Sequence, residues 1–212
     1  MKKLFLLLVV MLSLSGCMSA MVQPEGTLPA GFEIRTVAVK PEVIMEAQPF
    51  VQTPGEVWGG AIGGLLGAAI AAESSSVGQF SALMQQGNID LKEIVSSSFK
   101  EQLRSNRTKI KLAKGAGDVS VQLTVLFYGI HPDGPFSSEV EPMLEVGGQV
   151  FDHKGRHVLN ISESLKFPSD EEVTPRELEE YLSRPKLLAQ AYKQLADIIS
   201  KSMIEQLINR GQ

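Results

Sequence analysis

The sequence predicts an α+β fold in which helices cover one face of a mainly antiparallel sheet, as a two-layer sandwich. Strand patterns fill the middle of the chain, at 119–128, 143–151 and 157–167, and apolar and polar residues alternate cleanly in the first of them. Apolar residues recur instead at helical spacing over 90–103 and in a long C-terminal segment. One amphipathic helix and one long terminal helix suffice to cover a single sheet face.

The first part of the predicted domain combines one strand with irregular chain. β-Branched residues predict a first strand within 33–43, and two prolines predict a loop over 46–56. A glycine-rich insertion follows this strand, and the serine-rich stretch 74–88 is expected to be partly helical.

The clearest helix pattern spans 90–103. Asp90 is predicted as its N-cap, and Glu93 three residues later completes the pattern of a capping box. The apolar face of this helix consists of Leu91, Ile94, Val95, Phe99 and Leu103.

The second half of the chain is predicted to hold most of the sheet. Its strands are expected, in order, at 109–113, 119–128, 143–151 and 157–167. A proline-containing loop is expected over 132–142, and Gly155 marks 152–156 as a hairpin turn. Thr174-Pro175-Arg176-Glu177 predicts a helix start, with an N-cap, proline at the first helical position and glutamate at the third. The last helix is predicted from Pro185 to about Ile208.

Composition excludes several classes of protein. The 212 residues are 43% hydrophobic, 21% charged and 6% aromatic, which is ordinary for a globular domain. The net charge is −4 and basic residues are not clustered, so nucleic acid is not an expected partner. A single cysteine rules out an intramolecular disulfide and a cysteine-rich zinc site.

The amino terminus carries an export signal. Lys2 and Lys3 form a short cationic start, Leu4–Leu12 is an unbroken apolar run, and small residues precede Cys17. The apolar run is too short to span a bilayer core of about 30 Å. Residues 1–16 are therefore predicted to be a signal peptide.

Leu14-Ser15-Gly16-Cys17 resembles the lipobox of bacterial lipoproteins. The resemblance implies cleavage before Cys17, a diacylglyceryl group on its sulfur, and a further acyl chain such as palmitate on the new amino terminus. Several acyl chains make a stable membrane anchor. Residue 18 is Met rather than the Asp that retains enterobacterial lipoproteins in the inner membrane, so outer-membrane anchoring is expected. Residues 17–32, with two prolines and little periodicity, are predicted to be the lipidated tether.

The insertion at 57–72 contains sixteen residues without a charge. As a helix it would carry a glycine groove of the glycine-zipper kind, which lets helix backbones approach closely. Two interpretations remain open: insertion into the membrane, or a soluble arrangement in which the segment packs on the domain as a small-residue helix or loop or contacts another protomer outside the lipid. The candidate contact residues are Trp58, Gly59, Gly60, Gly63, Gly64 and Gly67.

The search for catalytic and metal-binding patterns yields no site. No nucleophile motif or phosphate-binding loop is present, and the resemblance assigns the only cysteine to the anchor. Asp152, His153 and His157 surround the predicted hairpin turn and are interpreted as surface residues. His131 is interpreted as a lone loop histidine. We therefore expect a protein that is not an enzyme and that binds no cofactor or metal.

The order of elements behind a lipobox is similar to that of the curli-secretion lipoprotein and of the amino-terminal domain of the Tol system's periplasmic protein. The resemblance is carried by Val37-Ala38-Val39, the helix 91–103, Gly117-Asp118-Val119-Ser120-Val121 and Phe151-Asp152-His153-Lys154-Gly155. It implies a single periplasmic domain over 33–212. The segment 57–72 departs from it, because it lacks the alternation of a membrane β-hairpin.

Two functional hypotheses follow. The first is a lipoprotein anchored in the outer membrane that faces the periplasm and serves as a non-catalytic accessory or assembly subunit of a cell-envelope complex, binding a protein partner through its sheet edge or helix faces. The alternative is an oligomeric component of an export or secretion apparatus, in which the glycine-rich segment mediates oligomerisation or membrane insertion.

Overall fold

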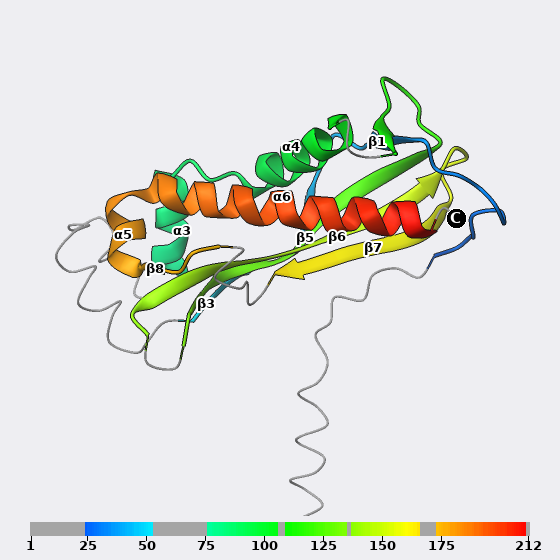
Figure 1. Cartoon of the computed structure of the whole chain (residues 1–212). Coiled ribbons are helices and arrows are strands. Elements are labelled where there is room, and N and C mark those ends of the chain that lie inside the picture. Colours follow the sequence, from blue (N-terminus) through cyan, green and yellow to red (C-terminus); the bar gives the residue numbers. More distant parts are fainter. Residues whose placement is uncertain (1–23, 53–75, 106–108, 135–136, 166–172, 211–212) are drawn as a thin grey trace, which may run out of the picture.

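The computed structural model describes residues 24–52, 76–105, 109–134, 137–165 and 173–210. Their architecture is α+β, with a mainly antiparallel set of long strands and helices on one side of the sheet (Figure 1). The predicted fold class is confirmed.

Three long strands form an antiparallel meander: β5 (Val119–Pro132), β6 (Glu139–Asp152) and β7 (His157–Leu165). The hairpin turn predicted at 152–156 joins β6 to β7, and Gly155 adopts the positive φ of 77° that such a turn requires. The loop predicted over 132–142 is shorter than expected. Strand β5 continues to Pro132 and β6 begins at Glu139. The two strands pair beyond the segment in which apolar and polar residues alternate.

Parallel strands on the other side of β5 are the main departure from the expected topology. The chain runs along β5 in three short steps, β1 (Thr36–Val39), β2 (Ile44–Met45) and β3 (Pro49–Val51), and β4 (Lys111–Leu112) pairs outside β1. The predicted loop 46–56 therefore contains β3. Pairing with β5 stabilises this segment, and Pro49 stands at an edge position, where a missing N–H can be tolerated.

The main helices agree with the predicted pattern. Helix α3 spans Ser76–Gln86, α4 spans Leu91–Arg104 and α6 spans Pro185–Arg210. Asp90 caps α4 as expected, because its carboxylate accepts hydrogen bonds from the N–H groups of Lys92 and Glu93 at 2.9 and 3.2 Å.

The helix start predicted at Thr174–Glu177 is wrong. Arg176 and Glu177 form strand β8, which pairs with Val140 and Glu139 of β6, and helix α5 begins at Leu178 and ends at Ser183. Backbone pairing with a distant strand overrides the local capping pattern here.

The core lies between the helical layer and the sheet. Helix α6 crosses β6 and β7 at Gly148, where an added Cβ would stand 3.0 Å from Ile161 and 3.2 Å from Met203. Fully buried members of this core include Phe99, Val121, Leu123, Leu144, Leu195 and Met203.

The described chain begins at one end of the sheet. Strands β1, β2 and β3 then follow one another along β5 toward the other end of the sheet. The N–H groups of Glu25 and Gly26 donate to the carbonyl of His157, at the start of β7, at 3.0 and 2.9 Å. Helices α3 and α5 and strand β3 lie at the opposite end (Figure 1). We call these the tether end and the distal end. No helix within the described ranges is long and apolar enough to cross a membrane.

Candidate functional site

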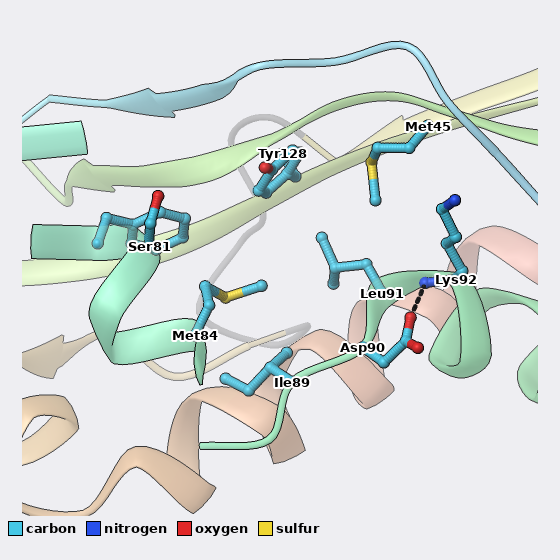
Figure 2. A pocket seen from close by; sticks show the side chains of 9 residues that line it. Met45, Ser81, Met84, Ile89, Asp90, Leu91, Lys92 and Tyr128 are labelled. Carbon is cyan, nitrogen blue, oxygen red and sulfur yellow. Dashed lines mark hydrogen bonds between the residues drawn. The ribbon is translucent and has the colours of Figure 1, made fainter. Parts of the chain in front are cut away.

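An open hollow of mixed polar and apolar lining lies at the distal end, between α3, the start of α4 and the parallel edge of the sheet. Its volume is about 540 Å³, within the usual range of ligand pockets. We call it the methionine pocket; it is lined by Met45, Phe80, Ser81, Met84, Ile89, Asp90, Leu91, Lys92 and Tyr128. In Figure 2 the side chains of Met45, Met84 and Leu91 converge on the space beside the Tyr128 ring.

Three separate parts of the chain build the methionine pocket. Met45 comes from β2 and Tyr128 from β5, which are neighbours in the sheet, whereas Met84 comes from α3. The turn between α3 and α4 closes one side: Asn88 adopts a positive φ of 48°, and the Ile89 N–H donates to the Met84 carbonyl at 2.9 Å. Buried Phe80 packs near Tyr128, with ring centroids 6.3 Å apart.

Asp90 and Lys92 bring one charge of each sign to the mouth of the methionine pocket. The Asp90 carboxylate is already engaged by two backbone N–H groups of α4. Lys92 is exposed and makes no ion pair with any residue that the structure describes. Of these two charged side chains, Lys92 is the one that can pair with a negative group of an occupant, beside the apolar side chains of the lining.

A second hollow, of about 430 Å³, adjoins the methionine pocket along α4. We call it the basic groove; Lys92 lines both hollows, so the two meet there. The basic groove is lined by Pro41, Glu42, Val43, Lys92, Glu93, Ser96, Ser97, Lys100 and Arg104. Lys92, Lys100 and Arg104 follow at helical spacing, and the latter two also lack ion pairs within the described chain.

Exposed apolar side chains gather around the same end of the sheet. The large hydrophobic residues with the highest exposed fractions among those described are Ile44, Phe50 and Val77, at 37%, 41% and 42%. They lie on β2, β3 and α3, the elements that border the methionine pocket or neighbour it. Phe50 also stacks against Phe127, with ring centroids 5.4 Å apart.

Another hollow, of about 630 Å³, lies between the C-terminal parts of α4 and α6 and includes Ile204 and Lys201 in its lining. Ser105 and Lys109, which flank the undescribed residues 106–108 in the sequence, also belong to its lining.

His131 was expected in a loop, and that expectation is wrong. It belongs to β5, directly opposite Glu141 of β6, and its Nε2 lies 3.4 Å from a carboxylate oxygen of Glu141. Both side chains are buried, at 9% and 3% exposed. Tyr181 of α5 is buried close by, and burial raises the pKa of its hydroxyl to about 12. None of the three hollows described above includes His131, Glu141 or Tyr181 in its lining.

The residues around the hairpin turn are only partly on the surface. His153 is exposed as expected, but His157 is buried, packs against the Phe151 ring at 5.5 Å and contacts the Asn160 side chain at 2.8 Å. Asp152 accepts hydrogen bonds from Lys154 N–H and Arg156 N–H. No cluster of three metal-ligating side chains occurs in the described part of the chain.

The site residues predicted from the sequence lie outside the described ranges. They are Cys17, Trp58, Gly59, Gly60, Gly63, Gly64 and Gly67. The methionine pocket was not predicted. In the sequence it is indicated only by two apolar residues, Met84 and Ile89, just before the capped helix. These residues do not identify a pocket, because its opposite wall is a sheet edge that is distant in the sequence.

Comparison with known proteins gives distant likenesses. No protein-family model and no curated protein matches the chain. A crystal structure of a Xanthomonas campestris protein described under the family model DUF330 is 14% identical, over 91% of this chain and 94% of that one, with a TM-score of 0.41. A PelC dodecamer from Paraburkholderia phytofirmans is 9% identical, over 83% and 87%, with a TM-score of 0.32.

Proposed function

We propose that this protein is a lipid-anchored periplasmic subunit of a cell-envelope complex, with an accessory or assembly role and no catalytic one. The observation that carries the proposal is the position of the methionine pocket relative to the tether. The tether meets the sheet at His157, beside the start of β5, whereas the pocket lies at Tyr128, farther along β5. About nine residues of strand separate the two positions, or roughly 30 Å.

This arrangement suits a subunit that is held at one end and binds at the other. The lipobox resemblance supplies an anchor at Cys17, a few residues before the tether reaches the sheet. The open pocket and the exposed side chains of Ile44, Phe50 and Val77 supply the binding surface.

The test places a photo-reactive amino acid at Ser81, on the pocket, and in a second chain at His153, on the exposed hairpin turn. We expect a discrete envelope-protein adduct from Ser81 and none from His153. The adduct should be lost when Met84→Asp makes the pocket polar, and Cys17→Ser should release the chain from the membrane fraction. An adduct unaffected by Met84→Asp would contradict binding at the pocket, and unchanged membrane association of Cys17→Ser would contradict lipid anchoring.

The alternative is an oligomeric export component. It is favoured by one observation: strand β3, which precedes residues 53–75, and helix α3, which follows them, both lie at the distal end (Figure 1). The described residues on both sides of 53–75 therefore belong to the distal end, and in this alternative the contact between copies forms there. Native mass in detergent, with and without residues 57–72, tests this alternative. A discrete multimer that the deletion reduces to a monomer would support it, and a monomer in both cases would refute it.

A further inference from the structure

We propose that the methionine pocket and the basic groove together bind an extended acidic peptide of a partner protein, with a large apolar side chain in the pocket and a carboxylate on Lys92. This inference rests on the proposed function, and it specifies the chemistry of the partner. Three features of the described residues lead to it: the backbone edge at β2, the adaptable lining of the pocket, and the cations along α4.

The backbone edge favours a peptide over a lipid or a glycan. The Glu46 N–H donates to the carbonyl of Val125, and Met45 is paired opposite Val125. In a parallel ladder alternate residues face the neighbouring strand, so the backbone N–H and C=O of Met45 point away from β5. No strand among the described residues pairs with this outer side of β2. An extended peptide can satisfy both groups while its alternate side chains point toward the helices.

The lining of the pocket favours a large apolar side chain as the anchor. Met45 and Met84 face the hollow from opposite layers, and unbranched methionine side chains adapt to occupants of different shape. Aromatic carbon is supplied by Phe80 and Tyr128. A side chain projecting from a strand added beside Met45 would enter this hollow from its open side.

The charges along α4 favour acidic residues next to that anchor. Lys92 stands where the two hollows meet, and Lys100 and Arg104 continue the line along the basic groove. Glu42 and Glu93 also line the basic groove, so its charge is mixed rather than uniformly positive. Mixed charge suits a peptide with spaced carboxylates better than a dense polyanion, which both glutamates would repel.

The test measures peptide binding to the full-length chain in nanodiscs of neutral phosphatidylcholine. The probe is a fluorescent nonapeptide of alternating leucine and aspartate. Two matched peptides replace aspartate by lysine or leucine by serine. We expect the leucine–aspartate peptide to bind at least about tenfold more tightly than either matched peptide. Its affinity should fall as the salt concentration is raised.

Variants locate the binding. Lys92→Glu should lower the affinity for the leucine–aspartate peptide about tenfold. Lys201 is an exposed lysine on α6, and Lys201→Glu should leave this affinity unchanged. Met84→Asp should abolish binding. Circular dichroism and the urea unfolding midpoint show whether each variant is folded. Equal binding to wild type and Lys92→Glu would overturn the proposal.

A lipid occupant is the competing outcome. Vesicles of phosphatidylglycerol test this outcome. If they displace the peptide from wild type and no longer bind to Lys92→Glu, the groove binds anionic lipid and the peptide proposal fails. Failure of the peptide does not by itself overturn the proposed function. If the Ser81 adduct persists and still depends on Met84, a partner binds at the pocket with a different chemistry.

Discussion

The close approach of β3 to β5 at the distal end depends on Gly129. Strand β3 passes so close to β5 that a Cβ on Gly129 would overlap the carbonyl oxygen of Phe50. The Tyr192 hydroxyl donates to the Gly129 carbonyl at 2.7 Å, so this position also joins the sheet to α6. Residue 129 must therefore be glycine because β3 packs against it, and not because its backbone conformation requires glycine.

Gly129→Ala should displace β3 and lower the free energy of unfolding by about 2 kcal/mol, as overpacking typically does. Gly115→Ala is the matched control, because an added Cβ there meets no atom within 4 Å. Urea unfolding of both variants measures the difference. Similar midpoints for the two would show that β3 does not lie against Gly129.

Asp118 gives the domain an acid-sensitive contact. Its Oδ2 accepts hydrogen bonds from the N–H groups of Arg35 and Thr36 at 2.9 and 2.8 Å, just before β1 and at its first residue. Desolvation acts to raise the pKa of Asp118, but these hydrogen bonds, with Thr36 Oγ1 and the Arg35 charge, lower it below its ordinary value of 3.8. The ionised carboxylate is thus favoured in the folded state.

Because the folded-state pKa is lowered, this contribution to stability is present above about pH 3.8 and is lost as the pH falls through the lowered value. Asp118→Asn should cost about 1 kcal/mol at pH 7, an amount reduced by solvent screening. The difference from wild type should shrink as the pH is lowered from 5 toward 2. Urea unfolding across this range is the measurement, and a difference that stayed constant with pH would contradict the role of the charge.

At the scale of elements, one buried tyrosine of α6 makes a hydrogen bond to the sheet, whereas a buried tyrosine of α5 makes none in the described structure. The hydroxyl of Tyr192 is fully buried and donates to Gly129, whereas the buried hydroxyl of Tyr181 has no hydrogen-bond partner in the described structure. The two positions form a natural comparison, because both rings lie in the same core.

Tyr192→Phe should leave the Gly129 carbonyl with one fewer donor and cost about 1–2 kcal/mol. Tyr181→Phe removes a hydroxyl that makes no such bond and should be neutral or slightly stabilising. Thermal or urea unfolding distinguishes them. The interpretation fails if Tyr181→Phe is the more destabilising of the two.

The elements also show which sequence patterns predict structure reliably. Helix α4 forms where its apolar spacing and its Asp90 cap predict it, because both signals act within a few residues. Strands β3 and β8 were not predicted, since each is short and exists only through pairing with β5 or β6. For β8, the Thr174–Glu177 pattern predicted a helix that the long-range pairing prevents.

At the scale of the whole molecule, we expect the predicted tether to orient the domain on the membrane. Residues 17–23 lie between the predicted lipidated cysteine and the first described residue, and seven residues span at most about 25 Å. Because Glu25 and Gly26 are bound to His157, the hairpin turn at 152–156 should lie nearer the membrane than α3 does.

This orientation can be measured with a spin label on a cysteine introduced at His153 or at Val77, using nickel-chelating lipids as the relaxing agent. We expect stronger relaxation at His153 than at Val77. Cys17→Ser should reduce relaxation at both positions to the level in solution. Equal relaxation at the two sites in the anchored chain would show that the domain lies flat on the membrane.

The sequence by itself determined the α+β class, the capped helix α4, the long helix α6 and the β6–β7 turn, because each depends on residue spacing or on a turn within a short segment. The lipidated Cys17 and the glycine-rich contact remain predictions of the same local kind. Only the tertiary structure decided the parallel edge β1–β2–β3, the buried pairing of His131 with Glu141, and the methionine pocket. The physical reason is distance along the chain: Met45, Met84 and Tyr128 form one hollow only after β2 pairs with β5 and α3 packs near them, and no local pattern records that pairing.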